Sequence, residues 1–135
     1  MNKKNTNYLF KKYKKLFPAK DRKDLWQSLM GFGFSCGDGW FNIIDKLCEC
    51  IQQYINNNDN VSQVIVTQVK EKFGGLRFYV SNSDEIIDGM IWLSEHLSYS
   101  TCEECGAEGT CRECDNWFTT LCDKHYKLWK ENKLK

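Results

Sequence analysis

The sequence predicts an α+β fold in which helices pack on a β-hairpin or small antiparallel sheet, followed by a C-terminal zinc ribbon. Three observations predict it: a helical apolar repeat over residues 40–55, two β-prone segments around a glycine pair, and five of the eight cysteines after residue 100. We therefore divide the 135-residue chain into a helical and hairpin domain, residues 1–100, and a zinc-ribbon module with a short C-terminal helix, residues 101–135.

Aromatic and aliphatic side chains recur at helical spacing near the N-terminus, between Tyr8 and Phe17, and lysines fill the opposite side. The single proline of the chain ends this pattern. The pattern predicts a short basic amphipathic helix. Such a helix can lie on a membrane surface or in the groove of a partner, but more often it packs its apolar stripe on its own domain, which we favour. A second short helix is predicted from Leu25 to Met30, before a glycine-rich loop over residues 31–39.

The clearest helical repeat runs from Trp40 to Ile55, where eight apolar side chains fall on one face. We expect this face to lie in the core. Asp38 precedes the helix, and we expect its carboxylate to cap the free amides of the first turn. The asparagine-rich run at residues 56–60 predicts a loop after the helix.

Two β-prone segments flank Gly74 and Gly75, which predicts a β-hairpin with a two-residue glycine turn. The resulting register pairs Phe73 with Leu76, Lys72 with Arg77, and Lys70 with Tyr79. The apolar face then carries Ile65, Val69, Phe73, Leu76, Phe78 and Val80. The polar face carries Gln68, Lys70, Lys72, Arg77 and Tyr79. Glu71 falls on the apolar face, which predicts a bulge or an exposed hairpin end.

A further helix is predicted after the hairpin, with Ser83 as its N-cap and two acidic residues in its first turn. Its apolar stripe contains Ile86, Ile87, Met90, Ile91, Ser94 and Leu97. Because two strands alone bury too little surface to be stable, we expect the hairpin to pack against this helix and the helix that starts at Trp40.

The C-terminal segment has the ligand spacing of a structural zinc site. Cys102 and Cys105 form one C-x2-C pair, and Cys122 and His125 form a C-x2-H pair sixteen residues later. Each pair can present two donors from one tight turn, so that three thiolates and one imidazole close a tetrahedron around the metal. The segment from residue 117 to residue 121 predicts a strand that leads into the second pair, and a short helix is expected around residues 126–130.

A third pair, Cys111 and Cys114, lies within the same loop. If this pair replaced Cys122 and His125 as ligands, the loop between the two ligand pairs would be much tighter, so we favour Cys102, Cys105, Cys122 and His125. Six donors could also hold more than one metal ion. Three cysteines outside the module, Cys36, Cys48 and Cys50, are predicted not to bind metal.

Composition restricts the class of protein. No apolar run approaches the roughly 18 residues that a membrane span requires, and no secretory signal is visible, so we expect a cytoplasmic protein with no membrane partner. Charge is segregated although the net charge is only +1: residues 1–23 carry nine basic and one acidic side chain, whereas residues 24–122 carry five basic and fifteen acidic ones.

Three sequence blocks resemble a group of small uncharacterised bacteriophage and prophage proteins. These blocks are CGDGWFNIIDKLC at residues 36–48, QVKEKFGGLRFYV at residues 68–80, and TCEECG with LCDKH at residues 101–106 and 121–125. In that group the last two zinc donors are usually both cysteine, whereas His125 is the final donor here. The resemblance implies a phage or mobile-element origin and supplies no activity.

The sequence does not predict an enzyme. A zinc deaminase would need a histidine in an H-x-E context, which neither His96 nor His125 has. A cysteine nucleophile at Cys36 would need a histidine base, and a zinc ion with four protein ligands has no open coordination position. We therefore expect no small-molecule substrate.

Two binding functions remain. In the first, the chain is a protein-interaction inhibitor or adaptor that docks on a host or phage complex, for instance a defence nuclease or CRISPR effector. In the second, it is a regulatory protein that binds nucleic acid through the basic N-terminal helix and the polar hairpin face. The residues that would make either kind of contact are Lys11, Lys12, Lys15, Lys70, Lys72, Arg77 and Tyr79.

Overall fold

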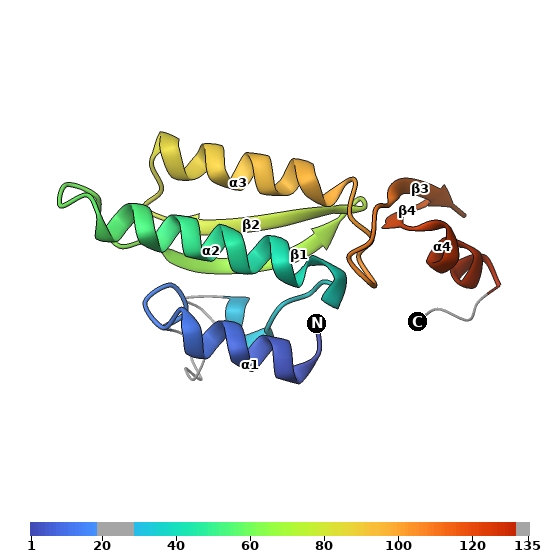
Figure 1. Cartoon of the computed structure of the whole chain (residues 1–135), viewed down its shortest axis with the longest axis horizontal. Coiled ribbons are helices and arrows are strands. Elements are labelled where there is room, and N and C mark those ends of the chain that lie inside the picture. Colours follow the sequence, from blue (N-terminus) through green and yellow to red (C-terminus); the bar gives the residue numbers. More distant parts are fainter. Residues whose placement is uncertain (19–28, 132–135) are drawn as a thin grey trace.

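The computed structural model describes residues 1–18 and 29–131 and has the predicted α+β fold. Two hairpins, each forming its own two-stranded antiparallel sheet, are combined with helices (Figure 1). The elements are α1 (Lys3–Lys12), the 3-10 helices η1 (Leu29–Phe32) and η2 (Asp38–Trp40), α2 (Phe41–Asn56), β1 (Ile65–Lys72), β2 (Gly75–Ser81), α3 (Glu85–Ser98), β3 (Thr110–Cys114), β4 (Trp117–Leu121) and α4 (Asp123–Lys130).

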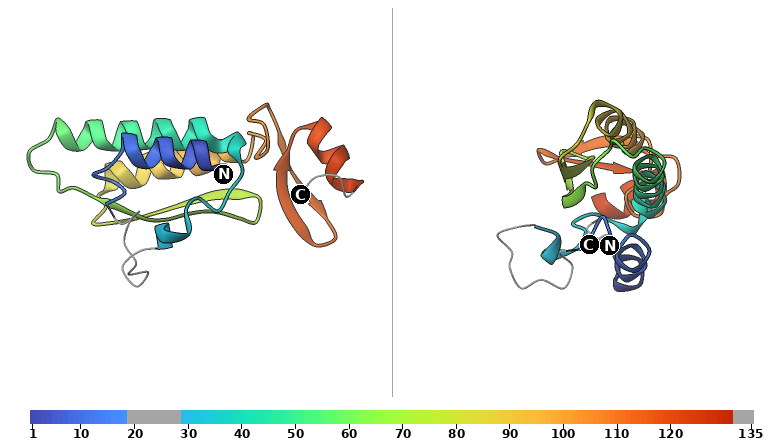
Figure 2. Two further views of the ribbon diagram at one scale, coloured as in Figure 1. Left: turned by 90° about the horizontal axis from the view of Figure 1, so that it is seen from below. Right: turned by 90° about the vertical axis from the view of Figure 1, so that its left-hand side faces the viewer.

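The helices α1, α2 and α3 form one layer, and the β1–β2 hairpin forms the other (Figure 2). The main core lies between the two layers and contains Trp40, Ile44 and Ile51 from α2 and the preceding turn, none of which is exposed. The hairpin contributes Val66, Val69, Leu76 and Phe78 to this core. The hairpin therefore packs on helices as predicted.

The N-terminal helix packs its apolar stripe on its own domain. Leu9, Phe10 and Tyr13 are buried, and the Tyr13 hydroxyl donates to the Asp45 carboxylate at 2.5 Å. Lys12 forms an ion pair with the same carboxylate at 3.1 Å. Because this buried aspartate receives two donors from the end of α1, the contact fixes α1 against α2. Leu25 and Trp26 of the second predicted helix lie outside the described residues, and η1 covers its last part.

The predicted N-cap of α2 was wrong. Asp38 begins the 3-10 turn η2, so α2 starts three residues later, with Trp40 at the N-cap position and no side-chain cap. Asp38 Oδ1 instead accepts from the Asn2 amide at 2.8 Å and from Asn5 Nδ2 at 3.1 Å. The carboxylate therefore ties the start of α1 to this loop.

The predicted hairpin register was also wrong, by one residue at the turn. The turn residues are Phe73 and Gly74, both with positive φ, and Lys72 pairs with Gly75. A Cβ on Gly75 would lie 2.3 Å from the Tyr99 ring, so this glycine serves close packing and leaves the turn to its neighbours. Phe73 is consequently exposed, and does not join the apolar face.

A bulge was one of the two alternatives predicted at Glu71, the other being the hairpin end, and the bulge lies elsewhere in the hairpin. The register shifts between Val66 and Gln68, so that Val66 is fully buried and Ile65 is only partly buried. Glu71 sits opposite Leu76 at the turn end of the hairpin, where its carboxylate accepts from the Gly74 amide at 2.7 Å.

The helix α3 lies along the outer edge of β2. The Ser98 hydroxyl accepts from the Leu76 amide at 2.8 Å, and the Glu95 carboxylate accepts from the Phe78 amide at 3.0 Å. These side chains satisfy edge amides that would otherwise be available for strand pairing. The N-cap is Asp84, which accepts from the Ile87 amide, and not Ser83 as predicted.

Residues 101–131 pack on the loop before α2. The Gly39 amide donates to the Glu103 carbonyl at 2.7 Å, and Trp40 Nε1 donates to the Thr101 carbonyl at 2.8 Å. The Glu103 carboxylate accepts from the Gly37 amide at 2.9 Å, and burial raises the pKa of Glu103 to about 7. These contacts join the first metal-ligand turn to the main core.

Candidate metal centre

The first pair of ligands lies in a tight turn. The Gly106 amide donates to the Cys102 carbonyl at 2.9 Å, and the Cys102 amide donates to the Ala107 carbonyl at 2.7 Å. Gly106 has a φ of +80°, which glycine adopts without steric cost. Cys102 is buried and Cys105 is exposed, so the turn presents one thiol from the interior and one from the surface.

The second pair lies where β4 passes into α4. Strand β4 ends at Leu121, as predicted, and Cys122 is the N-cap residue of α4, which begins at Asp123, three residues before the predicted start. His125 lies in the first turn of that helix. The His125 backbone amide lowers the pKa of the Cys122 thiol to about 7, because an amide at a helix N-terminus stabilises the thiolate.

The four predicted donor atoms lie together, all within 4.8 Å of one another. The Cys105 and Cys122 sulfurs are 3.9 Å apart, and His125 Nδ1 lies 3.6 Å from Cys102 Sγ and 3.2 Å from Cys122 Sγ. Around a tetrahedral zinc with bonds of about 2.3 Å to sulfur and about 2.0 Å to nitrogen, neighbouring sulfurs lie about 3.8 Å apart and sulfur lies about 3.5 Å from nitrogen. The donor spacing therefore suits a metal of this size.

The chemistry of the donor set matches zinc. Three thiols and an imidazole are borderline-soft ligands of the kind that structural zinc sites use. All four tetrahedral positions can be filled by the protein, which leaves none for a substrate. The arrangement can cross-link the turn at Cys102 to the start of α4.

The remaining cysteines whose side chains the structure describes do not join this cluster; the side chain of Cys114, one of the alternative ligands, lies outside the described part. Cys111 is exposed, and its sulfur lies 4.0 Å from the Phe73 carbonyl oxygen. Cys36 and Cys48 are buried in the main core, where burial raises the pKa of both thiols. Cys50 is exposed on α2. Among the described side chains, the favoured set of four is the one that forms a metal-sized cluster.

The predicted contact residues divide into two groups. Lys70, Lys72, Arg77 and Tyr79 do share the outer face of the hairpin, because Lys70 pairs with Arg77 and Gln68 with Tyr79. The Arg77 guanidinium also donates to the Tyr99 hydroxyl at 3.1 Å. On α1, Lys11 is exposed and Lys15 follows in the next turn, but Lys12 is engaged by Asp45. The first group lies on the hairpin, whereas Lys11 and Lys12 lie on α1 in the helical layer (Figure 2).

Sequence reasoning missed the exposed apolar side chains. Phe73 in the hairpin turn and Trp117 and Phe118 on β4 line one pocket, and α3 exposes Ile86, Trp92, Leu93 and Leu97. Phe73 was predicted to lie on the apolar face of the hairpin. The apolar residues of α3 were predicted to form a single stripe along one face of the helix. A signal was present in α3, since its apolar residues cover more than one helical face.

Comparison of the chain with protein-family models, with curated proteins and with solved structures found no match in any of the three. Within residues 1–18 and 29–131, no helix has the length and apolar character needed to cross a membrane.

Proposed function

We propose that this chain is a zinc-stabilised, non-enzymatic protein-interaction module that acts as an inhibitor or adaptor on a host complex, such as a defence nuclease or CRISPR effector. The observation that carries the proposal is an apolar groove between α2 and α3. Its apolar lining suits the apolar side chains of an amphipathic helix or loop of a partner protein. The resemblance to phage proteins supports the choice of a host complex as the partner.

The groove has a volume of about 370 Å³ and is lined mainly by aliphatic side chains. Leu93 is 59% exposed and Leu97 is 46% exposed, although the opposite face of α3 lies in the core. On α2 the groove is lined by Ile43, Leu47 and Cys50. Contiguous exposed apolar side chains of this kind mark interaction surfaces more often than isolated ones do.

Zinc would serve this function by holding the C-terminal module rigid. Among the described side chains of residues 101–131, only those of Cys102 and Leu121 are buried and apolar. A module with so small a core depends on metal binding for its folding free energy. We therefore propose that the metal is zinc and that its role is structural.

The test compares two glutamate substitutions on α3. Leu93→Glu places a charge in the groove, whereas His96→Glu places the same charge on an exposed part of α3 outside it. Tagged variants are expressed in bacterial cells, and co-purified proteins are quantified by mass spectrometry. We expect one stoichiometric protein complex to be retained by the parent and by His96→Glu and to be lost with Leu93→Glu. Equal recovery with both variants would reject the groove as the docking site.

Nucleic-acid binding is the second candidate, favoured by the grouping of Lys70, Lys72, Arg77 and Tyr79 on one hairpin face. Phosphates would contact the basic side chains, and a base would stack on Tyr79. Binding of DNA and RNA is measured over a range of salt concentrations. A steep loss of affinity with salt that becomes shallower in a Lys70→Gln, Lys72→Gln variant would support this candidate. No binding at low salt would remove it.

A further inference from the structure

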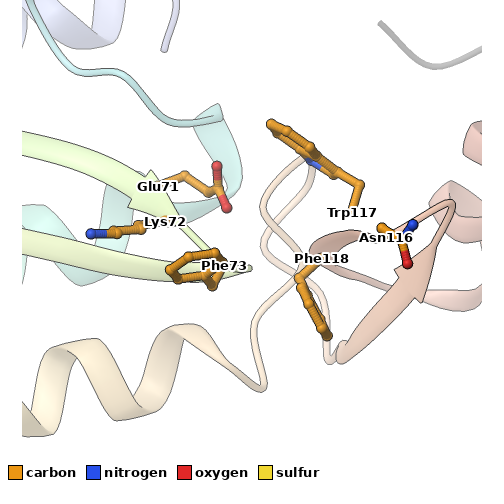
Figure 3. Close-up of a pocket in the computed structure, with 6 residues that line it drawn as sticks. All are labelled: Glu71, Lys72, Phe73, Asn116, Trp117 and Phe118. Atoms are coloured by element: carbon orange, nitrogen blue, oxygen red, sulfur yellow. The ribbon is translucent and has the colours of Figure 1, made fainter.

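The turn of the β1–β2 hairpin packs against the β3–β4 hairpin of the metal-binding module. The Thr120 hydroxyl on β4 donates to the Gly74 carbonyl at 2.6 Å, and Cys111 on β3 lies against the same turn. This contact holds the turn of the β1–β2 hairpin beside the aromatic end of β4 (Figure 3).

A pocket of about 250 Å³ lies at this junction. Its lining residues are Glu71, Lys72, Phe73, Asn116, Trp117 and Phe118. Phe73 is 64% exposed, Trp117 is 62% exposed and Phe118 is 39% exposed. Figure 3 shows the three rings around one gap, with the Glu71 carboxylate directed into it and the Lys72 side chain directed away.

Phe73 breaks two local rules at once. Its φ of +53° belongs to the left-handed region, which is unfavourable for a bulky side chain, and its ring projects toward solvent. Asparagine before glycine is the preferred pair for a turn of this type. An exposed aromatic side chain held in a strained turn gains nothing for the fold, and such conflicts concentrate at functional sites.

The chemistry of the lining favours a cation. Aromatic faces attract cations, and Lys72 Nζ already lies 5.6 Å from the centroid of the Phe73 ring on the side away from the pocket. The Glu71 carboxylate supplies a negative charge beside the rings. Among the described residues it accepts one hydrogen bond, from the Gly74 amide, so it retains acceptor capacity for a ligand.

We infer that this pocket binds the guanidinium group of an arginine side chain presented by a protein partner. A guanidinium is planar, so it can stack on the rings of Trp117 and Phe118 while it donates to the Glu71 carboxylate. The inference rests on the proposed interaction function and names a second contact for the partner, separate from the groove on α3.

The test uses the full-length protein and three short peptides of the form acetyl-Gly-X-Gly-amide, where X is arginine, citrulline or lysine. Citrulline has nearly the shape of arginine but lacks its charge. Binding is followed by the NMR signal of the Trp117 indole N–H, assigned by its absence in Trp117→Phe. We expect a saturable shift with the arginine peptide and at least tenfold weaker binding of the citrulline and lysine peptides.

Glu71→Gln removes the negative charge but keeps an oxygen that can accept from the Gly74 amide, so the turn is preserved. We expect this substitution to lower the affinity for the arginine peptide at least tenfold. Glu108→Gln, which removes an exposed charge from the C-terminal module outside the pocket, is the matched control and should leave the affinity unchanged. Equal affinities for arginine and citrulline, or for the two glutamine variants, would overturn the inference, as would the absence of any saturable shift.

This experiment separates the two proposals. Leu93→Glu should leave the arginine titration unchanged, because Leu93 does not line the pocket. Failure of the groove test with a normal arginine titration would reject the proposed docking groove alone. If the partner complex is retained but the arginine peptide causes no saturable shift of the Trp117 signal, only the proposed pocket is rejected.

Discussion

The metal-centre assignment predicts very different effects for three serine substitutions of exposed cysteines. Cys105→Ser removes one of the four ligands. Cys111→Ser alters a cysteine of the same module outside the cluster, and Cys50→Ser alters one on α2. Because all three thiols are exposed, each substitution costs little through lost burial. A difference between them must therefore come from the metal.

The expected magnitude follows from the small core of the module. Burial of Leu121, its one large buried aliphatic side chain, contributes about 2 kcal/mol. Structural zinc contributes about 10–16 kcal/mol of apparent binding free energy in small metal-dependent domains. Loss of a ligand should therefore unfold residues 101–131, while the main core between the helices and the first hairpin remains folded.

Hydrogen exchange measured by residue is the appropriate assay. In Cys105→Ser the protected amides of β3, β4 and α4 should exchange at unfolded rates, while the amides of α2 and β1 stay protected. Cys111→Ser and Cys50→Ser should retain the protection pattern of the parent. Equal protection in all three variants would refute the reasoning, and unfolding in Cys111→Ser would favour the alternative ligand set.

Four further substitutions test the packing. Gly39→Ala should destabilise the protein by about 1–3 kcal/mol in chemical denaturation, since its Cβ would lie 2.0 Å from the Cys102 carbonyl oxygen, whereas Gly89→Ala should stabilise it by up to about 1 kcal/mol. The same outcome for both glycines would contradict the close approach at Gly39. Tyr13→Phe should cost about 1–3 kcal/mol by removing a donor from the buried Asp45, and no change in the melting temperature would argue against that contact. Phe73→Asn should raise stability by about 0.5–1 kcal/mol through relief of the left-handed strain, and should abolish arginine binding. A loss of stability would mean that the Phe73 ring supports the fold.

The helices and the metal ligands were predictable because both depend on local spacing. The repeat that starts at Trp40 predicted α2 to within a residue at its C-terminal end, and the C-x2-C and C-x2-H pairs predicted the four donors that lie together. Neither prediction depends on how the rest of the chain folds. A helical face and a ligand turn are each defined by a few neighbouring residues.

The turn of the β1–β2 hairpin depends on a tertiary contact, which the spacing of residues in the sequence does not reveal. The glycine pair was assigned to the turn, but Gly75 is needed where the Tyr99 ring packs against β2. That requirement comes from a residue 24 positions away. The error shifted the pairing by two positions in total, which preserved which residues share a face, so the core residues of β2 were still correct.

Capping was mispredicted for a related reason. Asp38 has a suitable side chain and lies near the start of α2, but it begins a 3-10 turn that precedes α2, and its carboxylate accepts from the Asn2 amide and from the Asn5 side chain at the start of α1 instead. The exposed groups on α3 and around Phe73 were missed because apolar residues were assumed to be buried. Sequence pattern alone does not distinguish an apolar side chain that is buried in the core from one that is exposed at a binding surface.

The most direct test of the account is the metal content of the native protein. Elemental analysis of protein purified without added metal or chelator should find one zinc ion per chain, and acid or chelator treatment should release it with unfolding of residues 101–131. The absence of any stoichiometric transition metal, in protein whose C-terminal module is nevertheless folded, would contradict the account.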